Sequence, residues 1–82
     1  MPMNTDFKDT MNATPFALRG DHITLDALLK ATGLAHSGGA AKVLIGEGQV
    51  QVNGEAETRR GRKLRPGDVV QLGDQRLRIT AG

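Results

Sequence analysis

Residues 37–54, with the sequence SGGAAKVLIGEGQVQVNG, constrain the fold of this 82-residue chain more than any other stretch. Ser37 is a favourable helix N-cap, because its hydroxyl can accept a hydrogen bond from an amide of the first turn. Ala41, Leu44 and Ile45 follow at the spacing i, i+3 and i+4, which predicts a helix with one apolar stripe. We therefore expect a short helix, about three turns long, to begin at Ser37.

The same stretch continues directly into a β-hairpin. Gly48 stands where a helix commonly ends in a left-handed residue. Val50 and Val52 then alternate with polar residues, as in a half-buried strand. The dipeptide Asn53-Gly54 is a strong hairpin signal, because both residues tolerate the positive φ angles of a type I′ turn. The chain is therefore expected to reverse at Gly54, in a V-N-G hairpin.

A helix is also predicted upstream, within residues 22–33. Thr24 is a candidate N-cap, and Leu25, Leu28 and Leu29 share one face at helical spacing. A glycine closes this helix, and the three residues that follow form a short connection to the Ser37 helix. The two helices should therefore pack side by side.

Short strands are predicted on either side of this helical unit. Residues 55–58 should form the return strand of the hairpin, and residues 16–19 have the alternation of an edge strand. Pro-Gly-Asp at 66–68 predicts a turn before strands at 69–72 and 76–80. The expected fold class is α+β, with two short helices packed on one side of a small, mainly antiparallel sheet.

The length of the chain leaves room for one small domain. Residues 1–14 are polar and show neither helical nor strand periodicity, so we expect a disordered N-terminal tail, followed by the domain at 15–82. The sequence has no cysteine, which excludes disulfides and thiolate metal sites. It has no apolar run near the length of a membrane span and no signal-peptide pattern, so we expect a cytoplasmic protein outside the membrane.

Positive charge is concentrated in one segment, although the net charge is only +2. Five of the seven residues from 59 to 65 are basic: Arg59, Arg60, Arg62, Lys63 and Arg65. Such a cluster attracts polyanions, most simply nucleic acid, and the alternative is a solvated loop. Phe7 and Phe16 are the only aromatic residues. Base stacking is therefore nearly unavailable, and any nucleic acid should be recognised by its phosphates and shape.

Together these motifs resemble the S-four domain, a small RNA-binding module also called the αL motif. The resemblance spans residues 16–80 and rests on the leucines of the first helix, the Ser37-capped second helix, the G-x-V-x-V-N-G element that ends at Gly54, and Pro-Gly-Asp at 66–68. It is strongest toward short stand-alone bacterial members. It implies binding of structured RNA, either ribosomal or transfer RNA. We expect a monomer that needs no cofactor and associates with the ribosome.

The resemblance also implies where RNA would bind, namely the start of the second helix and the basic loop beyond the hairpin. The family usually has an arginine directly after the serine, and Gly38 occupies that position here. Open amides at residues 37–39 form a candidate anion site, with Lys42 one turn behind, although plain N-capping and close helix packing explain the same residues. The candidate RNA-binding residues are Ser37, Gly38, Gly39, Lys42, Arg59, Arg60, Arg62, Lys63 and Arg65.

Catalytic and metal-binding patterns are weak. His36 precedes Ser37, but neighbours at a helix cap rarely form a base and nucleophile pair, and no third residue is indicated. Two histidines without spaced carboxylates do not make a metal site, and residues 39–42 lack a complete phosphate loop. We therefore expect no enzyme activity, catalytic residue, cofactor or metal.

A second class of function remains open at this stage. Small β-grasp sulfur carriers also have a V-N-G-like turn, a late Gly-Asp and a C-terminal glycine, and this chain ends at Gly82. Carriers need a flexible Gly-Gly end, however, and here the penultimate residue is Ala81. The alternative to RNA binding is therefore a β-grasp-like carrier or a protein-interaction module.

Overall fold

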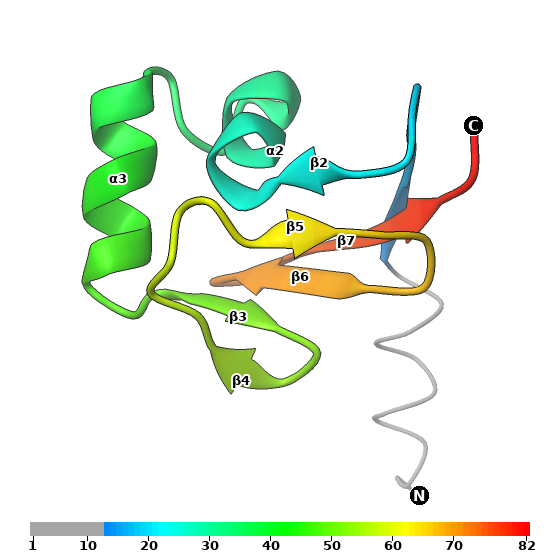
Figure 1. Ribbon diagram of the computed structural model, residues 1–82. Coiled ribbons are helices and arrows are strands. Elements are labelled where there is room, and N and C mark those ends of the chain that lie inside the picture. The colour runs from blue at the N-terminus through cyan, green and yellow to red at the C-terminus, as the bar shows by residue number, and fades with distance from the viewer. Residues whose placement is uncertain (1–12) are drawn as a thin grey trace, which may run out of the picture.

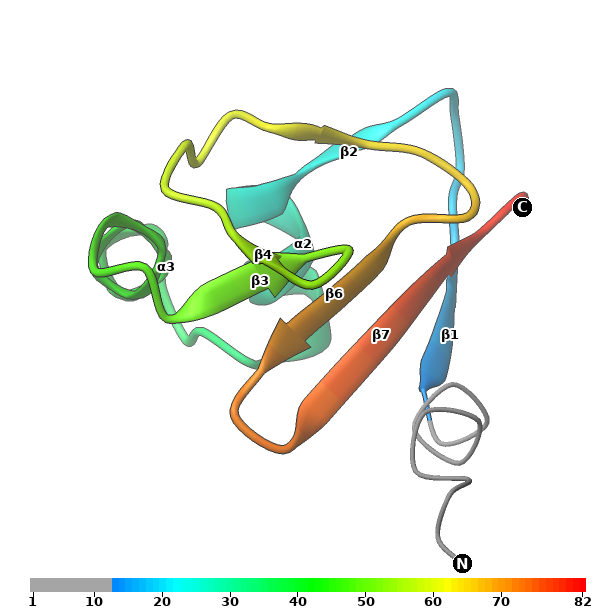
Figure 2. The same ribbon diagram turned by 90° about the horizontal axis from the view of Figure 1, so that it is seen from below.

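The computed structural model describes residues 13–82, so most of the expected tail lies outside the described part. Two helices pack against a five-stranded sheet: one covers a face of the sheet, and the other packs beside the first helix at the end of the sheet (Figures 1 and 2). The helices are α2 (Leu25–Thr32) and α3 (Gly38–Gly46). The strands of this sheet, in spatial order, are β1 (Thr14–Ala17), β7 (Gln75–Thr80), β6 (Val69–Leu72), β3 (Val50–Val52) and β4 (Glu55–Ala56).

The strands are paired antiparallel, except that β1 runs parallel to β7 at the edge of the sheet. A separate two-stranded sheet joins β2 (Ile23–Thr24) to β5 (Lys63–Leu64) in antiparallel register. The view from below shows the uncovered face of the large sheet, with α2 behind it (Figure 2). This arrangement confirms the predicted α+β class, with two helices on a mainly antiparallel sheet.

The Ser37 helix and the hairpin form as the sequence predicts. The Ser37 hydroxyl accepts a hydrogen bond from the Ala40 amide at 3.0 Å, and Gly48 is left-handed with φ 75°. Asn53 and Gly54 have φ angles of 54° and 88°, as a type I′ turn requires. Both ends of this stretch therefore follow from local sequence.

Asn53 also has a long-range role that its turn signal does not reveal. Its side-chain oxygen accepts a hydrogen bond from the Val69 amide at 2.9 Å, and its side-chain nitrogen donates to Asp68 Oδ1 at 3.0 Å. These bonds attach the hairpin to the start of β6. The Pro-Gly turn before β6 is confirmed too, because Gly67 has φ 100° and the Asp68 amide donates to the Arg65 carbonyl.

Several sequence predictions need correction. Thr24 occupies the N-cap position of α2, but its hydroxyl donates to Asp26 Oδ1 at 2.7 Å instead of accepting from a helix amide. The edge strand begins at Thr14, inside the segment expected to be tail, because β7 offers that segment a parallel partner. The return strand covers only Glu55–Ala56, because the chain then leaves β3 to reach β2.

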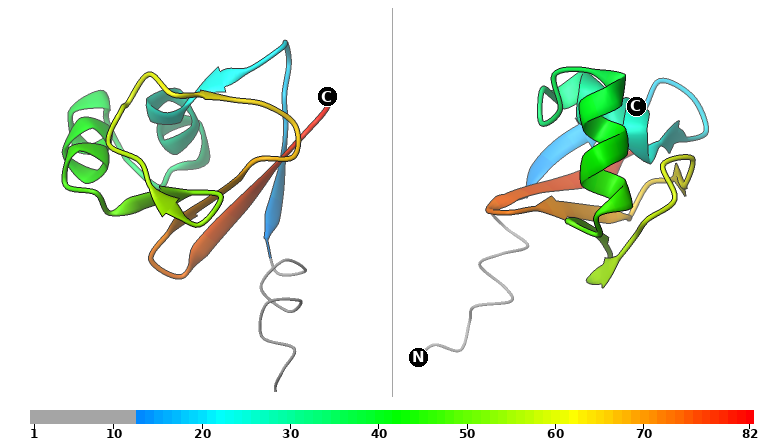
Figure 3. Two further views of the ribbon diagram at one scale, coloured as in Figure 1. Left: turned by 60° about the horizontal axis from the view of Figure 1, so that its bottom comes forward. Right: turned by 90° about the vertical axis from the view of Figure 1, so that its left-hand side faces the viewer.

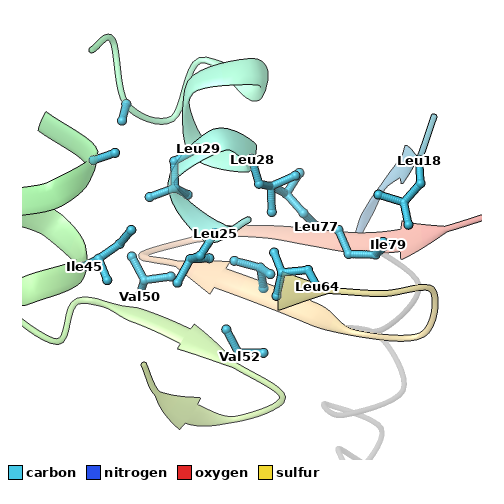
Figure 4. Packing of buried hydrophobic residues seen from close by; sticks show 13 residues of the cluster. Leu18, Leu25, Leu28, Leu29, Ile45, Val50, Val52, Leu64, Leu77 and Ile79 are labelled. Carbon is cyan, nitrogen blue, oxygen red and sulfur yellow. The ribbon is translucent and has the colours of Figure 1, made fainter. Parts of the chain in front are cut away.

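A single apolar core lies between the helices and the sheet (Figure 4). Leu25, Leu28 and Leu29 from α2 and Ala41 and Ile45 from α3 are fully buried. The sheets contribute the remaining large buried side chains, among them Val50, Leu64, Val70 and Ile79. Leu64 belongs to β5, so the basic segment, which the sequence predicts as a loop, contains a core residue.

We expect Leu64→Ala to lower the free energy of unfolding by about 2–5 kcal/mol, because the site is fully buried and a cavity would remain. Val43 on α3 is 55% exposed, so Val43→Ala is the matched control and should change stability by about 0.5 kcal/mol or less. Urea denaturation followed by circular dichroism measures both. Equal costs would show that Leu64 does not anchor the basic segment to the core.

Candidate nucleic-acid interface

The basic loop, defined here as residues 57–65, begins with a closed turn. The Arg62 amide donates to the Arg59 carbonyl at 3.2 Å, which places Arg60 and Gly61 at the centre of a β-turn. In both views the first part of the loop passes beside α3, and its last part forms β5 (Figures 1 and 2). The arginines of the sequence cluster are therefore arranged around one turn.

Glu57 holds this turn from inside. Its side chain is buried, with the residue only 8% exposed. Its Oε2 accepts hydrogen bonds from the amide and Nε of Arg59 at 3.1 and 2.9 Å, and its Oε1 accepts from Arg59 Nη2 at 3.2 Å and from Arg62 Nη1 at 2.8 Å. One carboxylate thus joins the two residues that flank the turn.

These contacts change the acidity of the carboxyl group. The side-chain hydrogen bonds from Arg59 and then Arg62 lower the pKa of Glu57 from 4.5 to about 2. The same pairing raises the pKa of the Arg59 guanidinium. Glu57 is therefore ionised at neutral pH, and the contacts with both arginines are charge-assisted.

The basic loop is fixed to the start of α2 by its backbone. The Leu25 amide donates to the Arg62 carbonyl at 2.9 Å, and the Asp26 amide donates to the Arg60 carbonyl at 3.1 Å. The Ala27 amide donates to Asp26 Oδ1 at 2.8 Å. The amides of the first turn of α2 are therefore satisfied within the protein, so this helix end is not open to an external anion.

The loop surrounds a shallow depression of about 530 Å³ lined by Arg59, Gly61, Arg62 and Lys63. Arg59 has a side chain that is 74% exposed, and that of Arg62 is 31% exposed. A Cβ added at Gly61 would meet no atom within 4 Å, so the depression is open at this point. Three cations around open space are suited to an anion such as phosphate.

The start of α3 offers a second set of anion-binding groups. Ser37 caps the Ala40 amide, and the amides of Gly38 and Gly39 have no partner within residues 13–82. A Cβ added at Gly38 would lie 4.0 Å from Cδ of Lys30, so the aliphatic chain of this lysine passes close to the helix start. Seen from the side of α3, the basic loop lies beside the C-terminal half of the helix, so the first turn of α3 and the loop are separate candidate sites (Figure 3).

The predicted site residues do not all gather at one point. Arg59, Arg62 and Lys63 line the depression, whereas Arg60 lies in the turn but outside the lining. Arg65 begins the Pro-Gly turn beyond β5, where its amide donates to Asp68 Oδ2. Lys42 is exposed on α3. The contact of each of these residues with RNA stays a prediction.

Sequence reasoning missed the role of Glu57 and the position of Lys30. Glu57 lies two residues before Arg59, which is a charge-pattern signal for an internal ion pair, but the pattern of residues 55–58 predicts only a return strand there. Lys30 gave no such signal, because its approach to Gly38 depends on how α2 packs against α3.

The described part of the chain has no metal-binding cluster and no helix that could cross a membrane. Residues 13–82 contain no group of three histidine or acidic side chains arranged to hold a metal ion. Among the same residues, neither helix has the length and apolar character needed to cross a membrane. An apolar cleft of about 440 Å³ is lined by residues that include Phe16, Leu18 and Ile23.

Comparison with known proteins identifies the family. The S4 domain model matches residues 16–80, so the chain belongs to the S4 domain family, as the sequence resemblance implies. RlbA of Bacillus subtilis (strain 168), named as a probable ribosome maturation protein, is 45% identical over 60 residues, which cover 73% of this chain and 84% of RlbA. YbcJ of Escherichia coli (strain K12) is 40% identical over 60 residues, which cover 73% of this chain and 86% of YbcJ.

A solved structure of a relative has a similar fold. The solution structure of YbcJ from E. coli, described as revealing an αL motif involved in RNA binding, matches with a TM-score of 0.66 and 38% identity. The match covers 85% of this chain and 90% of YbcJ. Family membership argues against the carrier alternative.

The ion pairs of Glu57 predict a specific pH dependence of stability. Because the pKa of Glu57 is lower in the folded protein, its stabilising contribution is complete above pH 4.5 and is lost as the pH falls toward about 2. Glu57→Gln cannot ionise, so its free energy of unfolding should fall less than that of the wild type over this window. Denaturant titrations of both proteins across the window measure the difference, and parallel pH profiles would contradict the ion pairs.

Proposed function

We propose that this protein binds structured RNA without catalysis, through the basic loop and the first turn of α3. The observation that carries the proposal is the open depression lined by Arg59, Gly61, Arg62 and Lys63. Two further features support it, namely membership of the S4 domain family and the similarity to YbcJ, whose αL motif is described as involved in RNA binding.

The two arginines that bond Glu57 keep enough donors to bind a phosphate. A guanidinium has five N–H donors. Arg59 directs Nε and Nη2 to Glu57, and Arg62 directs Nη1. The remaining donors, with the ammonium of Lys63, are available to phosphate oxygens at the depression.

Recognition is proposed to depend on RNA shape and phosphate positions. Phe16 is partly buried against the core, and the sequence contains no tyrosine or tryptophan on which bases could stack. Phosphate contacts position a protein on folded RNA but carry little sequence information. Ribosomal and transfer RNA are the proposed ligands, because both present rigid folded backbones.

The names of the relatives support a ribosomal context. RlbA is named as a probable ribosome maturation protein, and the two chains are similar over most of their lengths. We propose that this protein acts on ribosomal RNA or on the ribosome, as a monomer in the cytoplasm. No cofactor is needed for phosphate-led binding.

Binding to folded ribosomal and transfer RNA across a salt series tests the proposal. For phosphate-led binding, the logarithm of affinity should fall linearly with the logarithm of salt, with a slope equivalent to roughly three to five neutralised phosphates. Combining Arg60→Ala with Lys63→Ala should flatten the slope by about two units. Neither side chain has an ion pair with a described residue, so the fold should be retained.

Arg19→Ala is the matched control for charge. Arg19 is exposed and lines the apolar cleft, in the segment that joins β1 to β2. That segment lies on the far side of the molecule from the turn at residues 59–62 (Figure 1). Removal of Arg19 should leave the slope unchanged. If the wild-type protein does not bind either RNA at low salt, the proposed function is wrong. If Arg19→Ala also flattens the slope by about one unit, which is half the effect expected of the combined loop substitutions, binding depends on net charge and not on the loop.

The start of α3 is tested by changing Gly38. Its backbone is not left-handed and the space around it is open, so the fold should accept a side chain. Gly38→Asp should weaken RNA binding by about threefold to tenfold, because it adds negative charge beside the open amides. Gly38→Arg introduces the residue usual in the family and should strengthen binding by a similar factor.

Gly20→Asp makes the same charge change at an open position in the segment that joins β1 to β2. That segment lies away from the turn at residues 59–62 and from α3 (Figure 1). Gly20→Asp should affect RNA affinity less than Gly38→Asp, as measured by the same titration. Thermal denaturation checks folding, and Gly38→Asp should be at least as stable as wild type, since an acid near a helix N-terminus is favourable. Equal affinities for the two aspartate variants would exclude the α3 site.

A further inference from the structure

An acid at the centre of a basic site is unexpected on charge alone. Glu57 is buried, bonds two of the arginines that line the depression, and cancels one of the positive charges of the basic loop. If affinity for RNA depended only on charge, removal of Glu57 would strengthen binding. The geometry of its contacts indicates the opposite effect.

The two arginines that Glu57 bonds are the two ends of the turn. Arg59 and Arg62 carry like charges and repel each other, and each side chain has several rotatable bonds. The carboxylate accepts hydrogen bonds from both guanidiniums and also from the Arg59 amide, so it fixes backbone and side chains together. Both guanidiniums thereby remain beside Gly61, at the wall of the depression.

Contacts that do not involve Glu57 also fix the backbone of the turn. The carbonyls of Arg60 and Arg62 accept hydrogen bonds from the first amides of α2, and Leu64 anchors the next strand in the core. Loss of Glu57 would therefore leave the path of the loop largely in place while freeing the Arg59 and Arg62 side chains. This separation allows the effect of Glu57 on side-chain placement to be measured apart from folding.

We propose that Glu57 is a positioning residue, which preorganises Arg59 and Arg62 around the depression for one RNA phosphate. The inference rests on the proposed function, because it concerns the same surface. Preorganised donors bind a phosphate without first losing side-chain freedom, and this gain exceeds the repulsion between the phosphate and a carboxylate whose charge is already shared by two guanidiniums. Removal of a negative charge should therefore weaken binding to a polyanion.

The test compares two substitutions that change net charge equally. Glu57→Gln keeps the shape of the side chain but would present an amide group to the guanidiniums. Glu55→Gln removes an exposed acid from β4 in the same hairpin, two residues away. We expect Glu57→Gln to bind folded ribosomal RNA about threefold to tenfold more weakly than wild type, with a salt slope lower by about one unit. Glu55→Gln should bind as tightly as wild type or slightly more tightly.

The salt slope separates positioning from simple loss of stability. Partial unfolding lowers the fraction of active protein but leaves the slope of the remaining folded protein unchanged, whereas a lost phosphate contact lowers the slope. Glu57→Asp is the second variant, for use if Glu57→Gln does not fold. It keeps the charge but is one methylene shorter, so it should not span both arginines and should also weaken binding.

The outcomes are distinct. A folded Glu57→Gln protein that binds as tightly as Glu55→Gln, with an unchanged slope, overturns the positioning role while leaving the proposed function intact. If only Glu57→Asp is folded, wild-type affinity and slope in that variant overturn the role in the same way. Absence of RNA binding by the wild-type protein removes the proposed function, and the positioning role with it.

Discussion

The attachment of the basic loop to the first turn of α2 determines how the rest of this surface is built. Two carbonyls of the loop accept hydrogen bonds from the amides of Leu25 and Asp26, and β5 pairs with β2 just before the helix. Helix amides that would otherwise need water or a cap are thus satisfied by a segment about 35 residues further along the chain. A run of like charges that would repel itself in an isolated loop becomes an ordered edge of the domain.

The two described helices consequently differ in whether the amides at their N-termini are bonded within the protein. The chain itself fills the start of α2, whereas the start of α3 keeps the Gly38 and Gly39 amides open beside the aliphatic chain of Lys30. Because a helix N-terminus carries partial positive charge, α3 alone among the helices of residues 13–82 offers that charge to an external anion. The glycine at the position where the family usually has an arginine exchanges a mobile side-chain donor for exposed backbone donors.

Glu57 is a buried residue whose bonding partners belong to the charged surface. A buried carboxylate is costly unless its hydrogen bonds are made, and here both oxygens accept from arginines that also face solvent. Strong pairing keeps the group ionised and gives the turn a single arrangement. In a domain this small, with no cysteine and a modest apolar core, such internal ion pairs order a charged surface that apolar packing cannot reach.

Local sequence determined both helices, the Ser37 cap, the left-handed Gly48, the V-N-G hairpin and the Pro-Gly turn, because each depends on residues within one or two turns of each other. It also identified the residues from which the candidate interface is built. Tertiary structure alone decided that Thr24 does not cap α2, that residues 63 and 64 form a strand, that Glu57 joins Arg59 and Arg62, and that Lys30 approaches Gly38. The physical reason is that these features depend on pairing and packing between segments distant in sequence, for which hydrophobic periodicity and turn residues carry no signal.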